Sequence, residues 1–190
     1  MVIMTRTIKN HWLAGSRICL SPNWDERPSS VIDTVVVHNI SLPPGQFGEC
    51  HIEELFCNSL DPLAHPYFEE IHHLRVSAHL LINREGECCQ FVGFDKRAWH
   101  AGQSSFQGRE NFNDFSIGIE LEGSDHVAYT AEQYLQLAEV IILLKRAYPQ
   151  IADGNIVGHD QIAPGRKTDP GPAFDWLRLR GLLTVVAETV

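Results

Sequence analysis

The chain has 190 residues, 44% hydrophobic and 21% charged, with a formal net charge of −9. This length suits one domain, and we expect a single domain over residues 1–190 with its core at about 20–183. The negative charge argues against nucleic acid as a partner, because nucleic-acid binding requires a basic surface. No apolar run approaches the roughly 20 residues of a membrane helix, and no apolar block suits a signal peptide. We therefore expect a cytoplasmic protein without a membrane partner.

Five cysteines are an odd number for a chain without an apparent export signal, so we expect reduced thiols. None lies in a C-x-x-C pair, which argues against zinc-ribbon and thioredoxin-like sites. Cys88 and Cys89 lie in a strand-like run and are expected to pack in the core. The others are Cys19, Cys50 and Cys57.

Residues 31–40 (VIDTVVVHNI) form the first predicted strand, because β-branched residues dominate them. Alternation puts Val36 and His38 on one face, and Val35 and Val37 on the other. His38 lies at the carboxyl end of this strand, just before the break at SLPPGQFG. A histidine there can point into a cleft as a ligand, or it can be a structural histidine with its hydrogen bonds satisfied.

Residues 51–60 are predicted to be a helix, because their apolar residues fall close to one face. A loop over residues 61–70 is expected next, followed by the imidazole-rich run IHHLRVSAH. The adjacent His72 and His73 would point in different directions, so paired ligation by them is not expected. Arg75 is a candidate carboxylate clamp, with a plain surface arginine as the equal alternative.

Residues 78–83 and 87–94 are predicted to form a hairpin around Arg84-Glu85-Gly86, with glycine at the tight position. His79 lies inside the first strand and is interpreted as structural. A glycine-bearing loop follows, with Trp99 and His100 at its start. Trp99 could form a wall for a sugar or peptide, or it could be a local plug.

Residues 115–123 (FSIGIELEG) form the next predicted strand, with Glu120 between Ile119 and Leu121. A carboxylate in such an apolar setting costs free energy unless it is paired, and burial should raise its pKa. A raised pKa suits a general base or acid. A solvent-facing carboxylate at the strand edge is the alternative, which we expect to describe Glu122 better.

Thr130 and Gln133 form a capping box that predicts the start of a long helix ending before Pro149. Its apolar stripe indicates a scaffold element. Residues 155–158 can form a short strand that delivers His159. A last helix is predicted over residues 173–183, with Phe174, Trp176, Leu177 and Leu179 as packing residues.

Residues 158–171 (GHDQIAPGRKTDPG) contain His159, Lys167 and Asp169, and their proline and glycine content predicts an irregular loop. His38, His159 and Asp169 would together leave a fourth tetrahedral position for water, as in a catalytic zinc site. Bound zinc lowers the pKa of such water to about 7. Glu120 could take its proton, and Lys167 could stabilise the oxyanion. Spacing alone does not establish that these residues meet.

Read together, VVVHNISLPPGQFG, HPYFEEI, SAHLLI, RAWHAG, NDFSIGIELEG and GHDQIAPGRKTDPG resemble the AmpD-type enzymes of the amidase-2 family. These are cytoplasmic 1,6-anhydro-N-acetylmuramyl-L-alanine amidases of peptidoglycan recycling, related to phage amidases and peptidoglycan recognition proteins. The resemblance covers residues from about 20 to 180. It implies an α/β (α+β) fold in which a central mixed β-sheet is flanked by helices, with zinc at one rim of the sheet.

The resemblance also implies roles for particular residues. His38, His159 and Asp169 match the zinc ligands, Glu120 the catalytic glutamate and Lys167 the transition-state lysine. Three further residues match positions near the muropeptide substrate: Asn39, Arg75 and Trp99. Aspartate as third ligand is typical of AmpD-type enzymes, whereas phage amidases and catalytic recognition proteins have cysteine there.

The sequence departs from the family pattern at two places. His159 is followed by Asp-Gln where relatives often have a small or polar residue and then Asp-Ile. The run after Arg109 lacks the cysteine commonly seen before Asn-Asp, so residues 110–113 are given no substrate contacts.

We therefore expect a monomeric zinc amidase that cuts the bond between the lactyl group of anhydro-muramic acid and L-alanine of a small muropeptide. The main alternative is a peptidoglycan-binding module without catalysis. A lytic amidase acting on intact sugar chains is less favoured, because aspartate replaces cysteine. A cysteine-dependent hydrolase is the weakest alternative.

Overall fold

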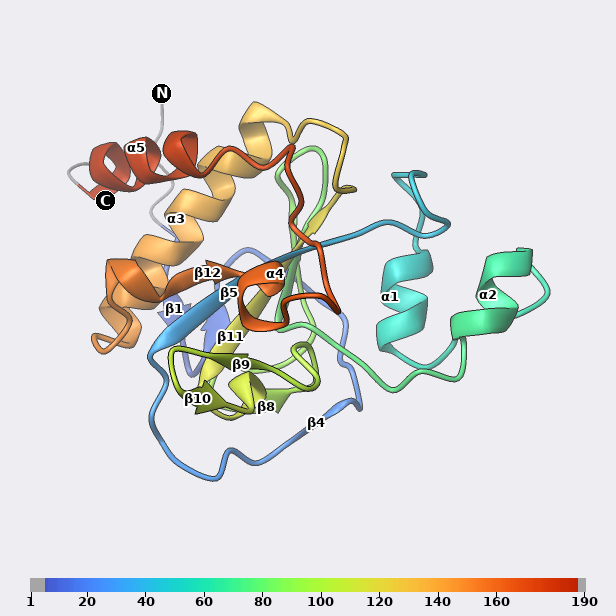
Figure 1. Ribbon diagram of the computed structural model, residues 1–190, viewed down its shortest axis with the longest axis horizontal. Helices are drawn as coiled ribbons and strands as arrows, with labels where there is room; N and C mark the ends of the chain where they lie inside the picture. Colours follow the sequence, from blue (N-terminus) through green and yellow to red (C-terminus); the bar gives the residue numbers. More distant parts are fainter. Residues whose placement is uncertain (1–5, 188–190) are drawn as a thin grey trace.

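The structure is a computed structural model that describes residues 6–187. A β-sheet that includes β5, β11 and β12 lies at its centre (Figure 1). The sheet has six strands, in the order β12-β5-β11-β6-β7-β3. Neighbouring strands are parallel except for β6 and β7, so the sheet is mixed, as predicted. The strands are β3 (Arg17–Ile18), β5 (Thr34–Ile40), β6 (Leu80–Ile82), β7 (Cys88–Gln90), β11 (Ser116–Glu122) and β12 (Ile156–Gly158).

Short antiparallel pairs accompany the central sheet. They are β1 (Ile8–Lys9) with β2 (Trp12–Leu13), β4 (Trp24–Asp25) with β8 (Arg97–Ala98), and β9 (Ser105–Phe106) with β10 (Arg109–Glu110). A 3-10 turn, η1 (Phe112–Asp114), precedes β11, and a second, η2 (Asp153–Asn155), precedes β12.

Helices cover both faces of the sheet (Figure 1). Val35 and Val37 of β5 pack in one cluster with the apolar stripe of α3 (Ala131–Ala147) and with α5 (Trp176–Ala187). The opposite face packs against α1 (His51–Phe56) and α2 (Pro66–Ile71). Val36 belongs to a third cluster on that side. The predicted alternation along β5 is confirmed, and it points His38 away from α3.

Two predictions on the α1–α2 side need correction. The helix expected over residues 51–60 ends at Phe56, because Asn58 adopts a left-handed conformation with φ of 60°. Residues 66–70, expected as part of a loop, form α2 together with Ile71. Pro66 occupies its first turn, and the ring of His65 accepts a hydrogen bond from the Tyr67 amide. Histidine is not among the usual N-cap residues, so the sequence signal was weak.

Three predictions near the carboxyl half also need correction. The expected irregular loop begins with a short helix, α4 (His159–Ile162), which ends before Pro164. Leu177 is 79% exposed and does not pack in the core. Glu122, expected to face solvent, is buried, and its carboxylate accepts hydrogen bonds from the amides of Gly48 and Arg84.

The capping box at the start of α3 is confirmed. The Thr130 hydroxyl accepts from the Gln133 amide at 3.1 Å, and the Gln133 side chain accepts from the Thr130 amide at 3.1 Å. We expect Thr130→Ala to lower the free energy of unfolding by about 1 kcal/mol, because an amide at the helix start loses its partner. Urea denaturation would measure the change. Thr130→Ser, which keeps the hydroxyl, should retain most of the stability, and equal losses in both variants would contradict the capping role.

Candidate metal centre and active site

The three predicted metal ligands converge at the carboxyl ends of parallel strands. His38 Nδ1 lies 2.9 Å from His159 Nδ1 and 3.2 Å from Asp169 Oδ2, and His159 Nδ1 lies 3.0 Å from Asp169 Oδ2. Both imidazoles are buried, and Asp169 is half-buried. Two imidazoles and one carboxylate at this spacing form a group that could hold a metal ion.

The sheet topology explains why His38 and His159, which are 121 positions apart in the sequence, lie side by side. Strand β12 pairs in parallel with β5, with Gly158 opposite Val37, so His159 emerges beside His38. A Cβ atom at position 158 would lie 2.2 Å from Asp160 Oδ1 and 2.9 Å from Pro170 Cδ. The missing side chain therefore lets the loop fold back onto β12. The Asp160 amide then donates to the Asp169 carbonyl at 2.9 Å, which holds Asp169 near both histidines.

The chemistry of the donor set fits a cation. His159 Nε2 lies 3.1 Å from the Ala101 carbonyl, which can only accept, so Nε2 holds the proton and Nδ1 presents its lone pair. Burial would raise the pKa of Asp169, but the two histidines beside it, His159 and His38, outweigh burial and lower that pKa. Burial, and then His159, lower the pKa of His38 to about 4. Neutral imidazoles and an ionised carboxylate are the states that bind zinc.

Glu120 lies directly opposite His38 in the register of β11 and β5. Its side chain is buried, and Oε2 has no hydrogen-bond partner among the described residues. Burial raises the pKa of Glu120 well above its usual value, and Asp169 raises it further, whereas Lys167 opposes the shift. The exposed Lys167 lines the same cavity. The arrangement places a carboxyl group able to exchange protons beside the three-ligand cluster.

A cavity of about 500 Å³ opens over these residues. Its walls include the candidate metal ligands, Glu120 and Lys167, together with apolar side chains of α1 and α2. Asn39 and Trp99 also line it, and the Asn39 amide group donates to Asp125 at 2.9 Å. Such a half-apolar cavity with convergent polar groups suits a small ligand.

Comparisons with known proteins give the family. The model of the N-acetylmuramoyl-L-alanine amidase family (amidase-2) matches residues 27–172, more than half of the chain. The chain belongs to the N-acetylmuramoyl-L-alanine amidase family. It is 60% identical over 178 residues to the 1,6-anhydro-N-acetylmuramyl-L-alanine amidase AmpD of Escherichia coli, covering 93% of this chain and 97% of that protein.

Solved structures agree with this assignment. The crystal structure of a selenomethionine AmpD derivative matches with a TM-score of 0.90 and 60% identity, covering 93% of this amidase and 98% of that chain. The Escherichia coli amidase AmiD, solved with the substrate anhydro-N-acetylmuramic acid-L-Ala-D-gamma-Glu-L-Lys, matches with a TM-score of 0.58 and 25% identity. That match covers 94% of this chain and 65% of the AmiD chain.

The third residue expected near the substrate, Arg75, lies apart from the other two in this amidase. It is exposed, outside the lining of the cavity, and its guanidinium group donates to the carbonyls of His72, His73 and Leu74. A substrate contact by Arg75 therefore stays a prediction that requires its side chain to move. No side chain expected as a metal ligand or catalytic group lies outside the cavity.

Sequence analysis assigned no role to His100, which the structure places against the candidate metal site. His100 Nδ1 lies 2.9 Å from His38 Nε2, on the side of that ring turned away from the other ligands. The interpretation of His79 as structural is confirmed. It is buried, and its Nδ1 accepts from the Gly118 amide at 3.0 Å. Burial, and then Arg27, lower the pKa of His79 to about 3.

Other potential sites in the described part of the amidase contain none of the predicted metal-binding or catalytic residues. All five cysteines are free, and Cys88 and Cys89 are buried packing residues, as predicted.

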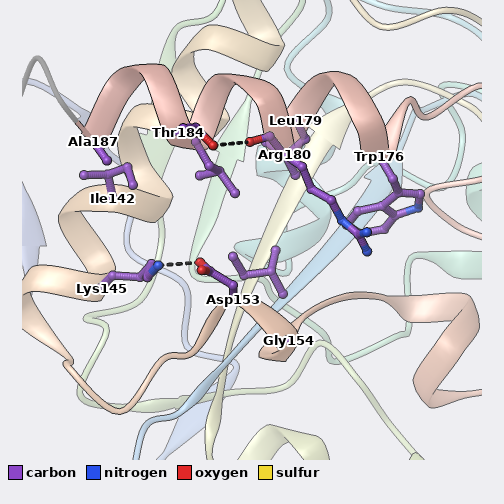
Figure 2. A pocket seen from close by; sticks show the side chains of 11 residues that line it. Ile142, Lys145, Asp153, Gly154, Trp176, Leu179, Arg180, Thr184 and Ala187 are labelled. Carbon is purple, nitrogen blue, oxygen red and sulfur yellow. Dashed lines mark hydrogen bonds and ion pairs between the residues drawn. The ribbon is translucent and has the colours of Figure 1, made fainter.

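A second cavity, of about 540 Å³, lies between α3, α5 and β12 on the opposite face of the sheet (Figure 2). There the Lys145 ammonium group bonds to Asp153, and none of the predicted site residues lines it. Within residues 6–187, no helix combines the length and apolar character needed to span a bilayer.

Proposed function

We propose that this amidase is zinc-dependent and hydrolyses the amide between the lactyl group of 1,6-anhydro-N-acetylmuramic acid and L-alanine of the stem peptide. The main supporting observation is the cluster of three ligand atoms within 3.2 Å of one another beside the buried Glu120. The 60% identity to a protein named for this activity, over almost its whole length, supports the choice of substrate.

His38, His159 and Asp169 would hold one zinc ion, which supplies an activated water and polarises the scissile carbonyl. Glu120 accepts a proton from the attacking water as the oxygen–carbon bond forms. Its raised pKa lets it keep that proton and then deliver it to the alanine nitrogen as the carbon–nitrogen bond breaks. The ammonium group of Lys167 faces the developing negative charge on the carbonyl oxygen. The products are a free lactyl carboxylate and a peptide with a free amino terminus.

The cavity suits a small muropeptide. We propose that Trp99 packs against the sugar or the peptide and that Asn39, fixed by Asp125, hydrogen-bonds to the substrate. Arg75 would bind a substrate carboxylate after leaving the carbonyls that it now contacts. The place of action is proposed to be the cytoplasm, in peptidoglycan recycling, and the protein is proposed to act as a monomer. Both follow the family resemblance.

Mass spectrometry of the products formed from anhydro-muramyl tripeptide tests the reaction. The proposed reaction adds one water and releases the intact tripeptide together with anhydro-N-acetylmuramic acid. Release of alanine alone would indicate cleavage at a different bond. Binding of the muropeptide without any release, by protein that contains one zinc ion per chain, would favour a recognition module instead.

A further inference from the structure

A chain of hydrogen bonds runs from His38 to a backbone carbonyl. His38 Nε2 lies 2.9 Å from His100 Nδ1, and His100 Nε2 lies 3.2 Å from Ser116 Oγ. The Ser116 hydroxyl, which is fully buried, donates to the Phe112 carbonyl. These four groups come from β5, the loop after β8, β11 and η1, so the fold itself brings them together.

The donor and acceptor of each hydrogen bond in this series follow from its last group, the Phe112 carbonyl. A carbonyl oxygen has no proton, so Ser116 must donate to Phe112 and accept from His100 Nε2. A neutral His100 with its proton on Nε2 has a lone pair on Nδ1, which can only accept from His38 Nε2. His38 then has its proton on Nε2 and a lone pair on Nδ1, the atom facing His159 and Asp169.

We propose that His100 and Ser116 are positioning residues that fix the tautomer and the ring orientation of His38, so that its Nδ1 is available to the metal. This inference rests on the proposed metal site. The Ala101 carbonyl, one residue further along, does the same for His159 through Nε2. One loop therefore orients both imidazole ligands, from the side opposite to the metal.

Two further features hold this loop in place. The Asn113 side-chain oxygen accepts from the amides of both His100 and Ala101, at 3.1 and 2.8 Å. Gly118 of β11 provides the space for the His100 ring, since a Cβ there would lie 2.4 Å from its Cγ. A ring packed this closely on a strand is set to one orientation.

Zinc affinity, measured by competition with a chromogenic chelator, tests the proposal without using activity. His100→Phe keeps a ring but removes the acceptor for His38, and we expect zinc binding to weaken about 10- to 100-fold. His100→Asn places an oxygen near the position of Nδ1 and should restore most of the affinity. Ser116→Ala should weaken zinc binding in the same direction, because His100 loses the partner that fixes its own tautomer.

Nitrogen NMR of the His38 ring in metal-free protein at mildly alkaline pH gives an independent readout. The proposal requires the Nε2–H tautomer in the wild type and a loss of that preference in His100→Phe. Gln133→Ala is the matched control, because Gln133 is a buried polar residue that donates to the carbonyls of Ile82 and Glu122. It should lower stability while leaving zinc affinity unchanged.

The outcomes separate this inference from the proposed function. Wild-type zinc affinity in both His100→Phe and Ser116→Ala, with an unchanged His38 tautomer, would overturn the positioning role and leave the zinc site intact. Equal weakening by His100→Phe and His100→Asn would also contradict it, because a loss of packing would then explain both. A wild-type protein that binds no zinc would instead overturn the proposed function.

Discussion

Glu120→Gln should lower the rate of muropeptide hydrolysis about 10²- to 10⁴-fold, the usual effect of removing a general acid–base. The side-chain amide of the introduced glutamine has nearly the shape of the glutamate carboxyl group, but it cannot accept the proton of the attacking water. Zinc content should not change, because Glu120 is not one of the three residues whose ligand atoms cluster. Initial rates with anhydro-muramyl tripeptide and metal analysis of the same sample would measure both effects.

Glu122→Gln is the matched control for this substitution. Glu122 is a second buried glutamate of β11, but it accepts from the backbone amides of Gly48 and Arg84 and does not line the cavity. We expect this variant to lose stability and to keep its activity. Full activity of Glu120→Gln at normal zinc content would remove Glu120 from the mechanism.

The raised pKa of Glu120 also predicts how stability depends on pH in the metal-free protein. Burial raises the folded-state pKa above the unfolded value, so the folded state favours the protonated form. The stability from this preference is fully present below about pH 4 and is lost as pH rises through the folded pKa. Metal-free Glu120→Gln should therefore gain stability over the wild type at neutral pH, with no gain at acid pH, in urea denaturation. A gain independent of pH would contradict the raised pKa.

Asp169→Ala should abolish hydrolysis at ordinary zinc concentrations and weaken zinc binding by more than about 100-fold. Replacing groups that merely support metal ligands already costs about 10- to 100-fold, and Asp169 would be a ligand itself. Its removal also leaves two neutral imidazoles without the only negative charge in the cluster. Zinc affinity and activity should fall together.

Asp160→Asn is the control for Asp169→Ala. Asp160 is a half-buried carboxylate of α4 in the same loop, and it does not belong to the ligand cluster. This variant should keep both zinc and activity. If Asp169→Ala bound zinc as tightly as the wild type, the third ligand would have to be another residue.

Much of the fold could be predicted from the sequence, because the patterns of the long elements are strong. The β-branched run before His38, the capping box at Thr130 and the strand around Glu120 all appear in the structure close to their predicted positions. Short elements were less predictable. Helix α2 begins with an unusual histidine cap, and α4 occupies four residues just before a proline.

The candidate site was predictable in its members but not in its geometry. Residue types and motifs indicated His38, His159, Asp169 and Glu120, whereas the spacing of about 3 Å depends on the parallel register of β12, β5 and β11. His100 was missed because its role depends on which ring nitrogen faces which neighbour. Nothing in the run RAWHAG specifies that before the Gly118 and Ser116 positions are known in space.

The most direct test of a zinc-dependent amidase is release of the stem peptide from anhydro-muramyl tripeptide by chelator-treated protein, before and after zinc is added back. We predict that release stops when zinc is removed and returns when about one zinc ion per chain is restored, with no effect of thiol alkylation. Undiminished release by protein shown to be free of metal would contradict the zinc mechanism and the roles proposed for His38, His159 and Asp169.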